Sequence, residues 1–120
     1  MTKPIPDEID VRYYEAESGR RPFERFFNRI GGMAAVKITA AISRLRAGNT
    51  GDSKSVGQGV SELRINWGPG YRLYYGWDKE KLIILLSGGA KKSKRQQSAD
   101  IAKAQKYWAD YKKRKRKGAS

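Results

Sequence analysis

The sequence predicts a single domain of the α+β class, on three observations. The chain has 120 residues with 38% hydrophobic content, which supports one modest core rather than two. Apolar residues recur at helical spacing between residues 22 and 45 and again near the carboxyl end. Between these helical patterns lie short runs with strand periodicity. The predicted order is therefore strand, helix, helix, three antiparallel strands, helix.

The first half of the chain predicts one strand and a helical hairpin. Residues 9–14 alternate apolar and polar side chains in the strand period. Pro22 suits the first position of a helix, which we expect to run to Ile30, where Gly31 and Gly32 end it. A second helix is expected over residues 33–45, ended by Gly48 and Asn49.

The second half predicts an antiparallel meander and a last helix. Residues 50–59 are rich in Gly and Ser and are expected to form a loop. Strands are expected over residues 63–67, 71–77 and 81–87, with Gly68-Pro69-Gly70 as the first turn. A helix then runs over residues 98–114, with Ser98 as its candidate cap.

Charge is concentrated in the second half of the chain. The 26 Lys and Arg against 12 Asp and Glu give a net charge of +14, and residues 61–120 hold 16 of the basic side chains. Such an imbalance indicates a polyanionic partner. Residues 112–117 are six consecutive cations, which we expect to be a frayed arm for a phosphate backbone or a solubilising tail. We therefore divide the chain into a folded domain, 1–111, and a basic, disordered tail, 112–120.

The composition excludes several kinds of chemistry. The chain has no Cys and no His, which rules out disulfides, thiol nucleophiles, imidazole bases and the usual zinc sites. No carboxylate pair stands out, and we expect no metal or other cofactor. Residues 1–10 lack the apolar segment of a signal peptide, and no run is long enough to span a bilayer. We expect a soluble cytoplasmic protein that does not bind membranes.

Strand alternation predicts that basic side chains converge on one face of the sheet. Leu63, Ile65, Trp67, Leu73, Tyr75 and Trp77 would form the core face, and Glu62, Arg64, Asn66, Arg72 and Tyr74 the open face. The loop after the last strand would bring Lys91, Lys92 and Lys94 to the same surface. Arg grips phosphate oxygens through two hydrogen bonds, Tyr74 could stack on a base, and a lysine crowded by other cations can become a proton acceptor. The alternative for each cation is a solvated surface side chain, and Glu62 is expected to pair with Arg64 rather than act as an acid.

Four motifs resemble a known family. The chain is similar to the RelE/ParE toxin superfamily, and specifically to HigB-like addiction-module killer proteins related to phage host-killing proteins, over about residues 8–111. The motifs are Glu62-Leu63-Arg64-Ile65, Gly68-Pro69-Gly70-Tyr71-Arg72, Gly88-Gly89-Ala90-Lys91 and Asp100-Ile101-Ala102-Lys103-Ala104.

The resemblance implies a toxin of a type II toxin–antitoxin pair. Its fold would be a β-α-α-β-β-β-α arrangement, in which an antiparallel sheet packs against a helical hairpin beside a carboxyl-terminal helix. Its partners would be a cognate antitoxin with a helix-turn-helix domain, the ribosome and messenger RNA. Relatives of this kind cut messenger RNA in the ribosome without metal, by attack of a 2′-hydroxyl on the adjacent phosphate.

The resemblance also implies roles for particular residues. Arg72 matches the arginine that contacts the scissile phosphate, and Arg64 a basic strand position that holds the phosphate or assists proton transfer. Either Lys92 or Lys91 takes the place of the basic residue after the last strand. We expect further RNA contacts from Tyr74, Lys54, Lys94 and Arg95.

Two other functions remain open from the sequence. A ParE-like inhibitor of DNA gyrase would share this fold and need no transfer chemistry. A nonenzymatic relative would only bind an antitoxin or nucleic acid. The grouping of Arg64, Arg72 and residues 91–95 favours RNA cleavage, because a gyrase-binding protein does not need a phosphate-shaped cluster.

Overall fold

A five-stranded mixed sheet forms the centre of the molecule. The computed structural model describes residues 8–118, so the predictions for residues 1–7 and 119–120 lie outside it. The strands are β1 (Asp10–Tyr13), β2 (Ser53–Ser55), β3 (Val60–Ile65), β4 (Tyr71–Trp77) and β5 (Leu82–Ala90). They lie in the order β1-β5-β4-β3-β2. The α+β class is confirmed, but the expectation of an antiparallel sheet is wrong at one edge, because β1 pairs parallel to β5.

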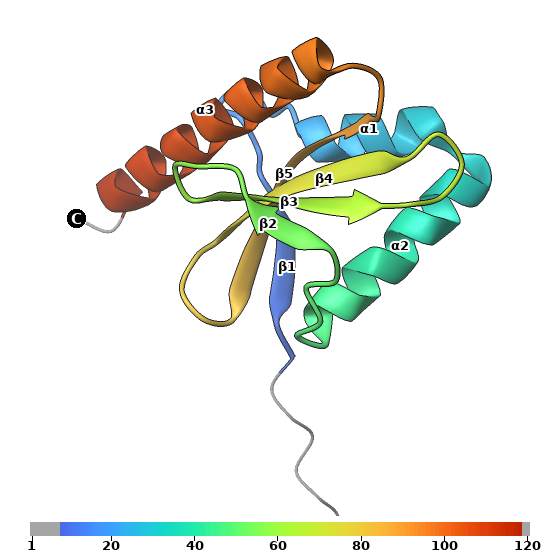
Figure 1. The fold of residues 1–120 in the computed structure, drawn as a ribbon. Coiled ribbons are helices and arrows are strands. Elements are labelled where there is room, and N and C mark those ends of the chain that lie inside the picture. Colours follow the sequence, from blue (N-terminus) through green and yellow to red (C-terminus); the bar gives the residue numbers. More distant parts are fainter. Residues whose placement is uncertain (1–7, 119–120) are drawn as a thin grey trace, which may run out of the picture.

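Helices cover both faces of this sheet (Figure 1). The hairpin of α1 (Pro22–Ile30) and α2 (Gly32–Arg46) lies on one face, and α3 (Lys94–Gly118) crosses the other. Pro22 occupies the first turn of α1 as predicted. Gly31 separates the two helices at a φ of 52°, a left-handed conformation that glycine adopts without a steric cost.

Two hydrophobic cores result, one on each side of the sheet. Side chains from α1 and α2 pack on the first face, and side chains from α3 on the second. The first core includes Phe23, Phe26, Ile38, Leu45, Leu63, Leu73, Tyr75, Ile83 and Leu85. The second includes Tyr14, Val60, Tyr74, Ile84, Leu86, Ala104 and Trp108. The prediction of one open face is therefore wrong over most of its area, because α3 covers it; Arg64 and the lysines of the loop after β5 are exposed at the end near the β3–β4 turn.

The last helix is longer at both ends than the sequence predicts. It begins at Lys94 rather than Ser98, and the Ser93 hydroxyl accepts a hydrogen bond from the backbone N–H of Gln96. It continues to Gly118, so residues 112–118 are helical and the expectation of a frayed, disordered arm is not met in that segment. Cations at the end of a helix interact favourably with its dipole, which offsets part of their mutual repulsion.

Two carboxylates attach the carboxyl-terminal half of α3 to the rest of the molecule. Asp110 accepts hydrogen bonds from the Tyr14 hydroxyl, at 2.6 Å, and from Arg114, at 2.9 Å. Asp78, in the turn after β4, accepts bonds from the Tyr111 hydroxyl and from Lys115. We call this group of six side chains the α3 latch; its members are Tyr14, Asp78, Asp110, Tyr111, Arg114 and Lys115. These contacts explain why the helix continues beyond residue 111.

The contacts of the latch shift the pKa values of its tyrosines and carboxylates. Burial, followed by the bond to Asp110, raises the pKa of Tyr14 to about 12, and burial with Asp78 does the same for Tyr111. Hydrogen bonds from Lys115 and Tyr111 lower the pKa of Asp78, and those from Tyr14 and Arg114 lower the pKa of Asp110. Within residues 8–118, no helix is long and apolar enough to cross a membrane.

Candidate phosphate-binding site

Five cationic side chains surround a cavity of about 370 Å³ at the end of the sheet. The cavity lies between the β3–β4 turn, the loop after β5 and the first turn of α3. We call it the basic cavity. Its cations are Arg64, Arg72, Lys91, Lys92 and Lys94, and its other lining residues include Asn66, Tyr71, Ser93 and Gln97. The structure thus brings together all four residues predicted to be catalytic.

Strand pairing places the two arginines side by side. Arg64 of β3 lies directly opposite Arg72 of β4, and Arg72 lies opposite Gly89 of β5. The backbone N–H of Lys91 donates a hydrogen bond of 2.8 Å to the carbonyl oxygen of Gly70, which ties the lysine loop to the β3–β4 turn. The predicted convergence of the arginines and lysines therefore depends on the register between β3 and β4 and on the hydrogen bond from Lys91 to Gly70.

A buried carboxylate lies beneath these cations. Glu62 of β3 is 0% exposed, and its carboxylate is 3.5 Å from Nε of Arg64, 3.8 Å from Nε of Arg72 and 4.0 Å from Nζ of Lys54. The side-chain amide of Gln97 donates a hydrogen bond to it at 2.9 Å. The expected ion pair between Glu62 and Arg64 is confirmed. A buried charge is costly to leave without partners, so the ionised Glu62 depends on these contacts.

The two arginines differ in how firmly they are held. The Arg72 side chain is 12% exposed, whereas the Arg64 side chain is 42% exposed. A guanidinium held between a buried carboxylate and the cavity has lost most of its rotamer freedom before any ligand arrives. Arg72 is therefore suited to fix an anion in position, and Arg64 to adjust to it.

Tyr74 does not belong to the open surface. Its side chain is fully buried under α3, in the second core, so the prediction that it stacks on a base is wrong. Burial, followed by the nearby Glu62 carboxylate, raises the pKa of its hydroxyl, which stays protonated. The alternation of β4 correctly places Tyr74 on the face opposite Leu73 and Tyr75, but the strand alone does not indicate that α3 covers this face.

The other predicted RNA contacts lie around the basic cavity. Lys94 lines it. Lys54, on the neighbouring strand β2, forms an ion pair with Glu62, the carboxylate beneath the cavity. Arg95 is exposed on the first turn of α3 but does not line the cavity. No group of three His, Cys, Asp or Glu side chains within residues 8–118 could hold a metal ion.

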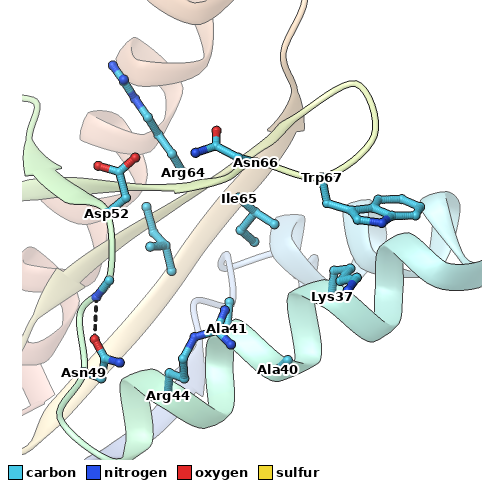
Figure 2. Close-up of a pocket in the computed structure, with 12 residues that line it drawn as sticks. Lys37, Ala40, Ala41, Arg44, Asn49, Asp52, Arg64, Ile65, Asn66 and Trp67 are labelled. Atoms are coloured by element: carbon cyan, nitrogen blue, oxygen red, sulfur yellow. Dashed lines mark hydrogen bonds between the residues drawn. The ribbon is translucent and has the colours of Figure 1, made fainter.

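A second cavity, of about 310 Å³, opens on the α2 side of the same strand (Figure 2). Lys37 and Arg44 of α2 line it together with Trp67 and Asp52. Figure 2 shows Ile65 directed toward α2, whereas the Arg64 side chain extends away from that helix. Arg64 thus borders both cavities, but its guanidinium belongs with Arg72 and Glu62.

The arrangement can bind a phosphate and stabilise added negative charge on it. Five cations around one cavity have a single fully buried carboxylate beneath them, so an unneutralised positive field remains at the opening. Donors fixed before the ligand arrives need no reorganisation when charge develops on the bound group. Sequence reasoning did not find Gln97, whose amide holds Glu62, since it lies on α3 far along the chain.

Comparison with known proteins shows the family. The family model described as Phage derived protein Gp49-like (DUF891) matches residues 25–109, which include both arginines and the lysine loop. An uncharacterized protein of Haemophilus influenzae is 43% identical over 83 residues, covering 68% of this chain and 81% of the relative. The chain therefore belongs to the Gp49-like phage-derived protein family, which is related to the toxins of toxin–antitoxin systems.

Proposed function

We propose that this protein is the toxin of a type II toxin–antitoxin pair and acts as a ribosome-dependent endoribonuclease on messenger RNA. The observation that carries the proposal is the basic cavity, in which Arg72 is held by the buried Glu62 while Arg64 and three lysines remain around the opening. The family relation to toxins supports the same conclusion. The proposed partners are a cognate antitoxin, the ribosome and its messenger RNA.

The proposed chemistry uses only side chains of the cavity. Arg72 holds the scissile phosphate, and the 2′-hydroxyl oxygen of the preceding ribose attacks its phosphorus. The bond to the 5′ oxygen of the next nucleotide breaks, which leaves a cyclic phosphate and a free 5′-hydroxyl. Arg64 stabilises the charge that develops on the phosphoryl oxygens, and Lys91 or Lys92 moves the proton from the attacking oxygen to the leaving oxygen.

Mapping of new 5′ ends in a growing bacterium tests the proposal. Wild type, Arg72→Ala, Arg64→Ala and Lys92→Ala are expressed under an inducible promoter, with primer extension across an abundant message. We expect cuts in phase with codons for wild type, a loss of at least about 100-fold for Arg72→Ala, and smaller losses for the other two variants. Lys106→Ala, an exposed change on α3 outside the basic cavity, is the matched control and should cut like wild type.

Two results would contradict the proposal. Growth arrest with intact messages and an SOS response would assign the protein to gyrase inhibition instead. Absence of arrest from folded protein would indicate a binding function without cleavage. Circular dichroism of each purified variant separates loss of activity from loss of structure.

A further inference from the structure

A second basic groove, of about 500 Å³, is lined by residues of α1 and α3. Its floor is the end of β5, from Ser87 to Ala90, and its walls are the two helices. We call it the α1–α3 groove. Lys92 lines both this groove and the basic cavity, so the two are continuous along the surface.

The floor of the groove is largely backbone. Strand β1 pairs with β5 only from Leu82 to Leu85, so within residues 8–118 the rest of that edge of β5 has no neighbouring strand. A Cβ atom on Gly88 would lie 2.5 Å from the ring of Phe26, and one on Gly89 would lie 2.7 Å from the Asp100 carboxylate. Gly88 therefore allows the Phe26 ring of α1 to pack directly on the strand, and Gly89 leaves room for the Asp100 carboxylate of α3, so both helices approach the floor of the groove closely.

The walls of the groove carry an excess of free positive charge. Arg20, Arg25 and Arg29 lie on the α1 side, and Lys92 and Lys103 on the α3 side. All five are exposed, and none makes an ion pair or side-chain hydrogen bond with any residue in the described part of the chain. The one acidic lining residue, Asp100, accepts a hydrogen bond from Gln96.

This lack of pairing distinguishes the groove arginines from three other arginines of the molecule. Arg12, Arg21 and Arg114 each pair with a carboxylate close by. Arg25 and Arg29 are instead one helical turn apart on α1, about 6 Å along its axis, with no acid to neutralise them. Two guanidiniums at this spacing can each bind a separate phosphate of one strand.

We propose that the α1–α3 groove binds the phosphate backbone of single-stranded RNA that continues from the nucleotide held in the basic cavity. This inference rests on the proposed function for the identity of the strand. Pro22, Phe26, Ile30 and Tyr107 also line the groove, but its exposed lining is mostly polar and strongly cationic. This favours a phosphate backbone over a protein segment, because protein interfaces are held by buried aromatic and aliphatic side chains. Lys92, which lines both the basic cavity and the α1–α3 groove, would contact the RNA where it passes from one to the other.

Binding of RNA of two lengths to the full chain tests the groove. Single-stranded oligonucleotides of about four and about twelve nucleotides are compared by fluorescence anisotropy over a range of salt. Wild type should bind the longer RNA more tightly. Arg25→Gln/Arg29→Gln should lose most of that gain, with the slope of log affinity against log salt reduced by about 1.4, or about 0.7 for each lost phosphate contact.

The matched control removes the same charge elsewhere. Lys106→Gln/Lys113→Gln changes two exposed cations of α3 that line neither the groove nor the basic cavity, and it should keep the slope and the length dependence of wild type. Equal behaviour of the two double variants would overturn the inference. Wild-type RNA binding by the groove variant, with loss of binding to a purified antitoxin, would also overturn it and assign the groove to a protein partner.

Failure of the proposed function can be recognised separately. If messages stay intact in the bacterium but Arg25→Gln/Arg29→Gln still loses the gain with RNA length, the groove stands and the cleavage proposal falls. If Arg72→Ala abolishes cutting while the groove variant binds both RNAs like the control, the cleavage proposal stands and the groove inference falls.

Discussion

Glu62 is a buried acid beneath a cavity whose charged lining residues are all cationic. Its carboxylate is fully buried, so a bound phosphate cannot contact it, and the positive charges of Arg64 and Arg72 offset its negative charge. Its contacts with Arg64 and Arg72 orient both guanidiniums from below. It therefore functions as a positioning residue for the proposed reaction.

A double-mutant cycle measures how much the ion pair between Glu62 and Arg72 contributes to stability. Arg72→Ala removes one of several partners of a buried carboxylate and should lower the free energy of unfolding by about 1 to 3 kcal/mol. Glu62→Gln/Arg72→Ala should recover part of that loss, since no buried charge is then left with fewer partners. Urea unfolding of the four proteins gives the coupling energy. A sum of independent effects would show that Glu62 does not hold Arg72.

The carboxyl-terminal helix illustrates what an element's own sequence leaves out. The apolar spacing of Ile101, Ala104, Trp108 and Tyr111 correctly predicts a helix through that region. The six cations after Tyr111 predict fraying by their mutual repulsion alone. Two carboxylates stabilise the helix there instead: Asp78, which is distant in sequence, contacts Tyr111 and Lys115, and Asp110, one helical turn earlier, contacts Arg114.

The α3 latch makes stability depend on pH at both extremes. The lowered pKa values of Asp78 and Asp110 mean that their contribution is present above about pH 4 and is lost as pH falls through the lowered values. The pKa values of Tyr14 and Tyr111, raised to about 12, give a contribution that is present below about pH 10 and is lost as pH rises toward 12.

Urea midpoints measured from acid to alkaline pH test this dependence. Asp78→Asn should cost about 1 kcal/mol at neutral pH and flatten the acid limb. Tyr14→Phe/Tyr111→Phe should flatten the alkaline limb, and Tyr13→Phe, at an exposed tyrosine, is the control for that change. Unchanged limbs in the variants would show that the latch does not stabilise the folded state.

The sheet was predictable in its centre and not at its edges. Strands β4 and β5 have strong apolar patterns, and the Gly68-Pro69-Gly70 turn fixes the pairing of β3 with β4. Strand β2, Ser53-Lys54-Ser55, carries no apolar residue, so its sequence resembles a loop and its pairing with β3 stabilises it. The parallel pairing of β1 with β5 joins two segments that lie far apart in the sequence, and no local pattern encodes it.

At the scale of the molecule, the net charge of +14 opposes the compact state. Most exposed cations have no carboxylate nearby, so added salt should screen their repulsion. We expect the melting temperature to rise by about 4 °C or more between low and moderate salt. The melting temperature of the Lys106→Gln/Lys113→Gln variant should rise less over the same change in salt, because this variant carries two fewer positive charges. A melting temperature that falls with salt would show that ion pairs such as those of the latch outweigh the repulsion.

The candidate site was predictable where its residues are close in sequence or paired by a turn. Arg64, Arg72 and residues 91–94 meet because one turn and one loop bring them together. The α1–α3 groove combines α1 with α3, and its basic residues are separated by most of the chain. Its recognition required the relative placement of the helices, which the sequence alone does not determine.

The place of β5 in the sheet has a consequence for synthesis of the protein. Both β1 and β4 use β5 as a hydrogen-bonding partner, and β5 is the last strand to leave the ribosome. The amino-terminal strand must wait, without its partner, until residue 85 has emerged. Arg64 and Arg72 likewise stay without the lysine loop until residues 91–94 have emerged. A nascent chain cannot assemble the basic cavity before that point, which delays the proposed activity against the ribosome that produces it.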